Sequence, residues 1–172
     1  RKQVIVKRLS SIENFGSMNI LCSDKTGTIT EGKVRLKDAL DIHGYHNDKV
    51  LKYAWLNASL QQGFHNPIDA AICQSYQLPS EKFTAITEVP YDFNRKRLTV
   101  QVTNGDETIG ITKGALNMIL HICDKIETAN GITDIAAYHN QIDEQYQQLS
   151  SSGFRTLGVS YRSVDKEHKI TR

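Results

Sequence analysis

The order of hydrophobic and polar positions divides the first half of the chain into short elements. After an extended opening, one segment has the spacing of a helix, and an apolar run then leads into a polar loop. Helix start signals follow, because Asn66 can cap a helix and Pro67 suits its first position. The predicted elements are a helix at 9–15, a buried strand at 19–23, a strand at 33–42, and helices at 47–60 and 67–76.

The second half has the pattern of an antiparallel sheet. Leu98, Val100 and Val102 alternate up to Asn104-Gly105, and Ile109 and Ile111 alternate after it, which predicts a hairpin. Apolar stripes predict helices at 116–123 and 138–149, and a strand is expected at 156–161. The predicted fold class is therefore α+β, an antiparallel β-sheet flanked by helices after residue 33.

Composition narrows the possible functions. The chain has 172 residues, with 21 Lys and Arg against 19 Asp and Glu, so its formal charge is +2. This length suits one domain, or one domain and part of another, and the near balance argues against nucleic acid as a partner. No apolar run approaches the length that crosses a bilayer, so we expect a soluble chain. The first residue is Arg1 and an extended segment begins at once, so we expect a piece of a longer protein. The three cysteines form no CxxC pair and are expected to be reduced, as in the cytosol.

The candidate chemistry begins where the apolar run 19–23 ends. The string Asp24-Lys25-Thr26-Gly27-Thr28-Ile29-Thr30 follows it directly. Asp24 could attack a phosphoryl group, because a carboxylate is ionised at neutral pH and needs no activating base. Lys25 would offset phosphate charge, and Gly27 would let the backbone pass close by. The alternative is an ordinary polar turn, since these residue types are all common in turns.

The string resembles the phosphorylation motif of P-type ATPases, the ion pumps that form an aspartyl-phosphate. The resemblance implies that residues 1–36 are an incomplete limb of an α/β, HAD-like phosphorylation domain and that 37–172 form the nucleotide-binding domain. It implies ATP and Mg²⁺ as cofactors. Asp24, Lys25 and Thr26 would be catalytic, and Asp24 and Thr26 would also bind the metal.

Three later clusters are similar to the nucleotide site of this family, and they lie at 66–72, 90–97 and 112–115. The segment 153–157 is similar to the part of the family that carries a late phosphate-contacting arginine. The resemblance gives Phe93 the role of stacking on adenine, and it implies contacts to the nucleotide from Asp69, Arg95, Arg97, Lys113, Gly114 and Arg155. Each has an ordinary alternative: Phe93 in the core, Asp69 as a helix-capping residue, Arg155 in a surface ion pair, and a Lys-Gly-Ala tripeptide that alone is weak evidence.

Missing motifs limit what the chain can do alone. It has no Gly-x-x-x-x-Gly-Lys-Ser/Thr loop, and Thr26 stands where phosphatases of the same fold keep a general-acid Asp, which favours a persistent phosphoenzyme. The family's later Gly-Asp-Gly-Val-Asn-Asp motif is also absent, so the Mg²⁺ site is incomplete. We therefore expect this chain to bind nucleotide without turning it over.

Within the family, the segments 12–22, 55–57 and 90–95 look most like the bacterial magnesium-transporting branch. The expected partners are ATP and the remaining phosphorylation, actuator and transmembrane domains of the same polypeptide, at the cytoplasmic face of the cell membrane. Two other functions stay open, a non-catalytic nucleotide-binding module and a fragment of a HAD-like phosphatase. The pair His43 and His46 could also suggest a metal site, although no further ligands stand at a suitable spacing.

Overall fold

The structure is a computed structural model that describes residues 5–25, 32–63, 66–76, 82–165 and 170. The chain divides into two compact units, Arg1–Lys33 and Val34–Arg172, which are described separately. Among the described helices, none combines the length and the apolar character that crossing a membrane requires.

The first unit contains the helix α1 (Ser10–Gly16), which confirms the helix expected there. The strand expected at 19–23 is wrong, because these residues form no strand and Ile20 and Leu21 are 75% and 72% exposed. A strand needs a neighbour to share its backbone hydrogen bonds, and no described residue pairs with this segment.

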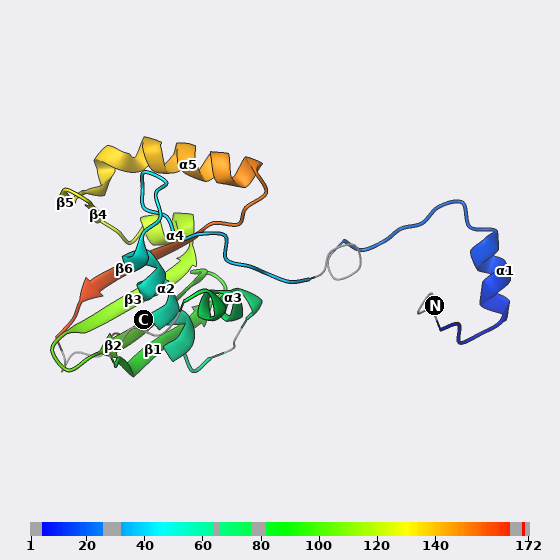
Figure 1. Ribbon diagram of the computed structural model, residues 1–172, viewed down its shortest axis with the longest axis horizontal. Helices are drawn as coiled ribbons and strands as arrows, with labels where there is room; N and C mark the ends of the chain where they lie inside the picture. Colours follow the sequence, from blue (N-terminus) through cyan, green and yellow to red (C-terminus); the bar gives the residue numbers. More distant parts are fainter. Residues whose placement is uncertain (1–4, 26–31, 64–65, 77–81, 166–169, 171–172) are drawn as a thin grey trace. The chain divides into compact units, whose positions relative to one another are not determined.

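The second unit is built on a four-stranded antiparallel sheet in the order β1-β2-β3-β6 (Figure 1). Its strands are β1 (Thr84–Asp92), β2 (Arg97–Thr103), β3 (Thr108–Ala115) and β6 (Leu157–Ser163). The hairpin expected around Asn104 is confirmed between β2 and β3. The Asn104 side chain accepts hydrogen bonds from the backbone of Asp106 and Glu107, and Gly105 takes a φ of +104° that favours glycine.

Two helices cover one face of this sheet, α2 (Asp48–Leu60) and α3 (Pro67–Ser75), and they pack against each other (Figure 1). Both confirm the sequence predictions. Asn47 and Asn66 cap them by accepting hydrogen bonds from the first backbone N–H groups of each helix. The main core lies between α2 and the sheet and consists of Tyr53, Leu56, Leu98, Val100, Val102, Ile109 and Ile111.

The register of the strands determines which side chains share a face. Leu98 pairs with Lys113, so the Lys113 side chain lies on the face covered by α2. Arg97 pairs with Gly114 on the opposite face, which carries α4 (Leu116–Leu120). A methyl group at Gly158, which pairs with Gly114, would lie 2.8 Å from Ile119 Cβ of α4. The sheet therefore separates Arg97 from Lys113.

The remaining elements only partly match the sequence predictions. The helix α5 (His139–Ser151) and the strand β6 confirm expected elements, and α4 is a shorter version of the helix expected at 116–123. The strand expected at 33–42 is wrong, since its only described pairing is an isolated bridge between Leu40 and His46. The side chain of Asp41 instead accepts hydrogen bonds from the backbone of His43 and Tyr45 and closes a turn.

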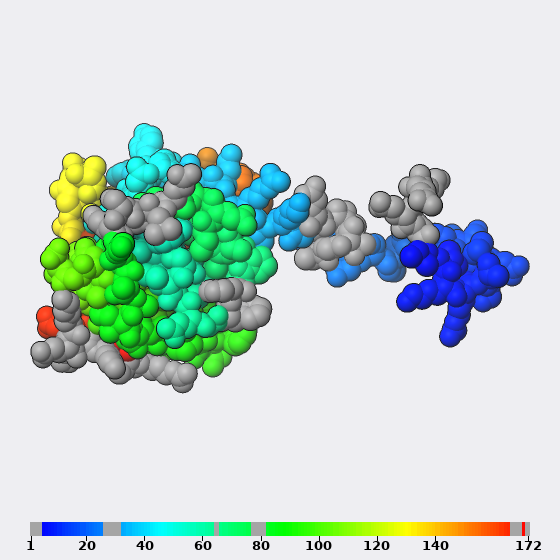
Figure 2. All heavy atoms as spheres, turned by 60° about the horizontal axis from the view of Figure 1, so that its bottom comes forward, coloured from blue at the N-terminus to red at the C-terminus, as the bar shows by residue number. Residues whose placement is uncertain are grey.

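Sequence reasoning did not predict four elements. These are β1, the hairpin of β4 (Lys125–Thr128) and β5 (Gly131–Asp134), and the 3₁₀ helix η1 (Ile135–Tyr138). The β4–β5 hairpin lies at the edge of the second unit (yellow in Figure 2). The second unit is α+β with an antiparallel sheet flanked by helices, as the sequence predicted.

Candidate functional site

A buried ion pair joins β3 to α3. The ammonium group of Lys113 bonds to Oδ1 of Asp69, and only 8% and 3% of the two side chains are exposed. Gln61, directly after α2, donates its Nε2–H to Oδ2 of Asp69 at 2.7 Å. Both carboxylate oxygens of Asp69 are therefore bonded, which offsets the cost of burying its charge.

Local sequence explains how Asp69 reaches this position. It stands in the first turn of α3, where Asn66 accepts hydrogen bonds from the backbone of Ile68 and Asp69. The capping role foreseen as an alternative for Asp69 is thus filled by Asn66. A carboxylate in the first turn also interacts favourably with the helix dipole. The Asp69 side chain is left to contact Lys113 and Gln61.

The ion pair also affects a neighbouring thiol. Cys73 follows Asp69 by one turn of α3, and burial raises the pKa of its thiol more than the charge of Lys113 lowers it. Cys73 is therefore a neutral thiol at physiological pH, not a nucleophile.

Aromatic side chains are exposed at the turn between β1 and β2. Phe93 is 86% exposed and Tyr91 is 49% exposed, and their ring centroids lie 5.4 Å apart in an edge-to-face arrangement. The alternative that Phe93 belongs to the core is wrong. An exposed phenyl face of this kind is available for stacking on a flat ligand.

Arg95 lies in the same turn and is held by Asp92. The Asp92 carboxylate accepts backbone hydrogen bonds from Asn94 and Arg95 at 2.8 and 2.9 Å, and the Arg95 Nε lies 3.5 Å from Asp92 Oδ2. The Nη2 atom of Arg95 is buried and has no hydrogen-bond partner among the described residues. It is therefore a spare donor.

Arg97 and Gly114 are not brought to the Lys113 side of the sheet. Arg97 Nη1 donates to the carbonyl of Met118 at 3.4 Å. A methyl group at Gly114 would lie 2.4 Å from the carbonyl oxygen of Lys96, so glycine is needed there for the close approach of β2 and β3.

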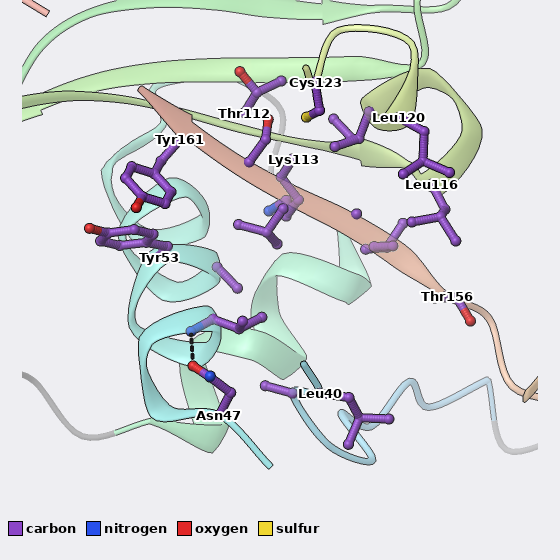
Figure 3. A pocket seen from close by; sticks show the side chains of 18 of the residues that line it. Leu40, Asn47, Tyr53, Thr112, Lys113, Leu116, Leu120, Cys123, Thr156 and Tyr161 are labelled. Atoms are coloured by element: carbon purple, nitrogen blue, oxygen red, sulfur yellow. Dashed lines mark hydrogen bonds between the residues drawn. The ribbon is translucent and has the colours of Figure 1, made fainter. Parts of the chain in front are cut away.

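Arg155 is exposed in the connection between α5 and β6. It lines a pocket of about 1340 Å³ that extends over both faces of the sheet and is also lined by Lys113, Arg95 and Arg97, whereas Asp69 and Phe93 are not among its lining residues. Figure 3 shows Lys113 in this pocket on the same side of the sheet as Tyr53 and Tyr161, while Thr112 and Cys123 lie toward the other face.

The residues of the candidate phosphorylation motif belong to the first unit. Asp24 and Lys25 are exposed, and Ser23 Oγ donates to the Asp24 carbonyl at 3.2 Å. Thr26 and Gly27 lie outside the described residues. An exposed carboxylate at Asp24 is compatible with a role as a nucleophile.

Two polar residues of this region were missed by sequence reasoning. Besides Gln61, the fully buried Asn57 donates its Nδ2–H to the carbonyls of Ile111 and Leu98 at 2.9 and 3.4 Å. Asn57 lies on α2, and Gln61 is the residue directly after the helix. A polar residue at a core-facing position of a helix was the signal that could have identified Asn57.

A second polar cluster attaches β4 to the sheet and to α2. Lys49 of α2 bonds to both carboxylate oxygens of Glu127 at 2.7 and 2.9 Å, and the Tyr161 hydroxyl donates to Oε2 of Glu127. These hydrogen bonds, first from Lys49 and then from Tyr161, lower the pKa of Glu127. The Tyr161 ring also packs on Tyr53, with centroids 4.9 Å apart (Figure 3).

The two histidines considered as metal ligands have separate partners. His43 Nδ1 pairs with the Gln141 side chain at 2.9 Å, whereas His46 lies between the carboxylates of Asp38 and Asp48, at 2.5 and 3.2 Å. No group of three or more His, Cys, Asp or Glu side chains among the described residues is arranged to hold a metal ion.

The surroundings of His46 predict a pH effect. The hydrogen bond with Asp38, followed by that with Asp48, raises the pKa of His46, and the same bond with His46 lowers the pKa of Asp38. The contribution of protonated His46 is complete below its ordinary value of 6.5 and is lost as the pH rises through its raised pKa. The contribution of Asp38 is complete above 3.8 and is lost as the pH falls through its lowered pKa.

In an NMR titration, we expect the His46 ring signals to shift with a midpoint above 6.5. The Asp38→Asn variant should move this midpoint back toward the ordinary value. Equal midpoints in the wild type and the variant would show that the contact with Asp38 is not formed in solution.

Comparisons with known proteins extend over nearly the whole chain. A family model described as P-type ATPase, cytoplasmic domain N, matches residues 11–171. "Magnesium-transporting ATPase, P-type 1" of Escherichia coli (strain K12) is 41% identical over 167 residues, which are 93% of this chain and 19% of that protein. The protein of the same name from Salmonella typhimurium (strain LT2) is 35% identical over 174 residues, with 96% and 19% covered.

A more distant relative is the "Plasma membrane ATPase" of Zygosaccharomyces rouxii. It is 33% identical over 177 residues, which are 99% of this chain and 19% of that protein. The chain therefore spans about a fifth of the length of these relatives.

Proposed function

The chain belongs to the P-type ATPase family, and from this we propose that its second unit binds ATP for a cation pump. The observation that supports this most is the buried pair of Asp69 and Lys113 with Gln61, on the sheet face next to α2 and α3. The adenine base of ATP would contact this cluster, and the Phe93 ring would stack on the base.

The remaining candidate residues are proposed to contact the phosphates or to position the strands of the site. Arg95, with a spare buried donor, and Arg155, exposed beside the pocket, would contact the phosphates. Arg97 and Gly114 would act through the positions of β2 and β3, because they lie on the other face of the sheet.

We further propose that Asp24 is the nucleophile in the intact protein. A carboxylate oxygen of Asp24 would form a bond to the γ-phosphorus while the bond from that phosphorus to the ADP oxygen breaks and ADP leaves. Lys25 would offset charge on the transferred group. Within the described residues, the exposed Asp24 supplies the oxygen ligand that Mg²⁺ prefers, and Thr26 is the proposed second contact. The ion when bound would neutralise phosphate charge.

The intact protein is proposed to be a magnesium-transporting ATPase at the cell membrane, with this chain on the cytoplasmic face. This proposal is supported by sequence identity, because the bacterial magnesium-transporting ATPases are 35–41% identical to the chain, compared with 33% for the yeast plasma membrane ATPase. The remaining domains of the same polypeptide would be its partners.

The test of ATP binding is calorimetric titration of the 172-residue chain with ATP and ADP. We expect saturable binding of both nucleotides and a loss of affinity of about fivefold or more for Phe93→Ala, because stacking on an aromatic ring contributes about 1–3 kcal/mol per base.

The matched control is Tyr45→Ala, because Tyr45 is also an exposed aromatic residue, at 71%, in a turn of another region. Its affinity should equal that of the wild type. The proposal fails if millimolar ATP does not bind, and the stacking role fails if both variants bind as the wild type does.

A further inference from the structure

We infer that Gln61 is a specificity-determining residue that makes the site prefer a purine with a 6-amino group over one with a 6-oxo group. The inference rests on the proposed binding of ATP. It assigns to the Gln61 side chain a contact with the base beyond its bond to Asp69.

The charge of the buried cluster decides which part of a nucleotide it can take. Lys113 carries one positive charge and Asp69 one negative charge, and they are bonded to each other. The cluster is therefore neutral overall, and the buried Asp69 carboxylate would repel a phosphate group. A neutral, flat base is the part of the nucleotide that this cluster fits.

Gln61 is held in a fixed orientation by its contact with Asp69. Gln61 is only 6% exposed, and its Nε2 donates a hydrogen bond to Asp69 Oδ2 at 2.7 Å. Because Nε2 is used in this way, the amide oxygen Oε1 points elsewhere as an acceptor. No hydrogen bond to Oε1 is formed within the part of the chain that the structure describes.

Asp69 and Gln61 both offer hydrogen-bond acceptors to a bound base. Each carboxylate oxygen of Asp69 can accept more than one hydrogen bond, so it keeps acceptor capacity beside Lys113 and Gln61. The 6-amino group of adenine has two hydrogens to donate, one for each of these residues. A 6-oxo group would place its oxygen against acceptors and leave them unpaired in a buried site, which is costly.

The experiment compares ATP with inosine triphosphate, in which an oxygen replaces the 6-amino group. We expect the wild-type chain to bind ATP at least about tenfold more tightly. Gln61→Met keeps the volume of the side chain and removes the amide, so the ratio of the two affinities should fall to about threefold or less. The control is Gln62→Met, since Gln62 is exposed and its hydrogen bond within the described part of the chain, to Glu88 at 2.6 Å, comes from its backbone N–H.

The ratio of the affinities for ATP and inosine triphosphate separates recognition of the base from a purely structural role. If Gln61 only supported the fold, Gln61→Met would weaken the binding of both nucleotides equally. The ratio would then be the same as in the wild type, which would overturn the inference. A wild-type chain that binds both nucleotides equally would overturn it as well. A wild-type chain that binds neither would instead refute the proposed ATP site.

A second measurement uses the wild-type chain, in case Gln61→Met does not fold. The side-chain NH₂ signal of Gln61 in an ¹⁵N NMR spectrum should shift when ATP is added and shift less with inosine triphosphate at equal saturation. Equal shifts with the two nucleotides would contradict the inference.

Discussion

Lys113→Met is expected to lower the free energy of unfolding by about 3–5 kcal/mol, because it leaves a buried carboxylate without its cation. Asp69 is 3% exposed, and in the variant the amide of Gln61 would be the one partner left to its carboxylate among the described residues. Methionine is similar to lysine in length and flexibility, so the change removes the charge with little change in packing. Urea unfolding followed by circular dichroism measures the effect.

The double variant Asp69→Leu with Lys113→Met is the control for this prediction. It removes both charges together, and replacing a buried pair by apolar residues is often close to neutral. We therefore expect it to recover much of the stability lost in the single variant. A single variant that loses less than about 1 kcal/mol would place the pair in a solvated environment, contrary to the structure.

The helices that the sequence predicted well are those with local signals. Asn47 and Asn66 cap α2 and α3 with their own side chains, and the information for such a cap lies within a few residues. The hairpin at Asn104 is also local. The strands expected at 19–23 and 33–42 failed because an apolar or alternating run shows that a strand can form, not that a partner exists for it.

The strand β1 was missed for a related reason. Pro90 lies within it, and its register with β2 shifts twice, so its side chains do not alternate regularly along the sequence. Bulges of this kind depend on how the partner strand pairs, and the sequence of one strand alone does not contain that information.

The candidate site shows the same difference between local and long-range information. Asp69 and Lys113 were both proposed from the resemblance, but they are 44 positions apart, and their direct contact was not foreseen. Gln61 has no local feature that points to Asp69. The face of the sheet that carries Arg97 could have been predicted, because Leu98, Val100 and Val102 alternate toward the core and so put Arg97 on the opposite face.

Asp24→Asn is expected to abolish the phosphoenzyme in a full-length protein that contains this chain. The side-chain amide is neutral and a poor nucleophile, so it cannot form the acyl phosphate. Incubation with ATP labelled in the γ-phosphate, followed by acid precipitation, should give labelled wild type that loses its label in hydroxylamine, and an unlabelled variant. Asp48→Asn is the control, because Asp48 is also an exposed aspartate and, among the described residues, its side chain pairs with His46 alone.

The same Asp24→Asn change should leave ATP affinity in the isolated 172-residue chain within about twofold, which is less than about 0.5 kcal/mol. The reason is that Asp24 belongs to the unit Arg1–Lys33, whereas the candidate nucleotide residues belong to Val34–Arg172. Label that persists in the full-length variant would refute Asp24 as the nucleophile. The isolated wild-type chain could instead hydrolyse small phosphate esters and lose this activity in Asp24→Asn. That result would support the phosphatase alternative, because a persistent phosphoenzyme requires that the chain lacks the groups that activate water.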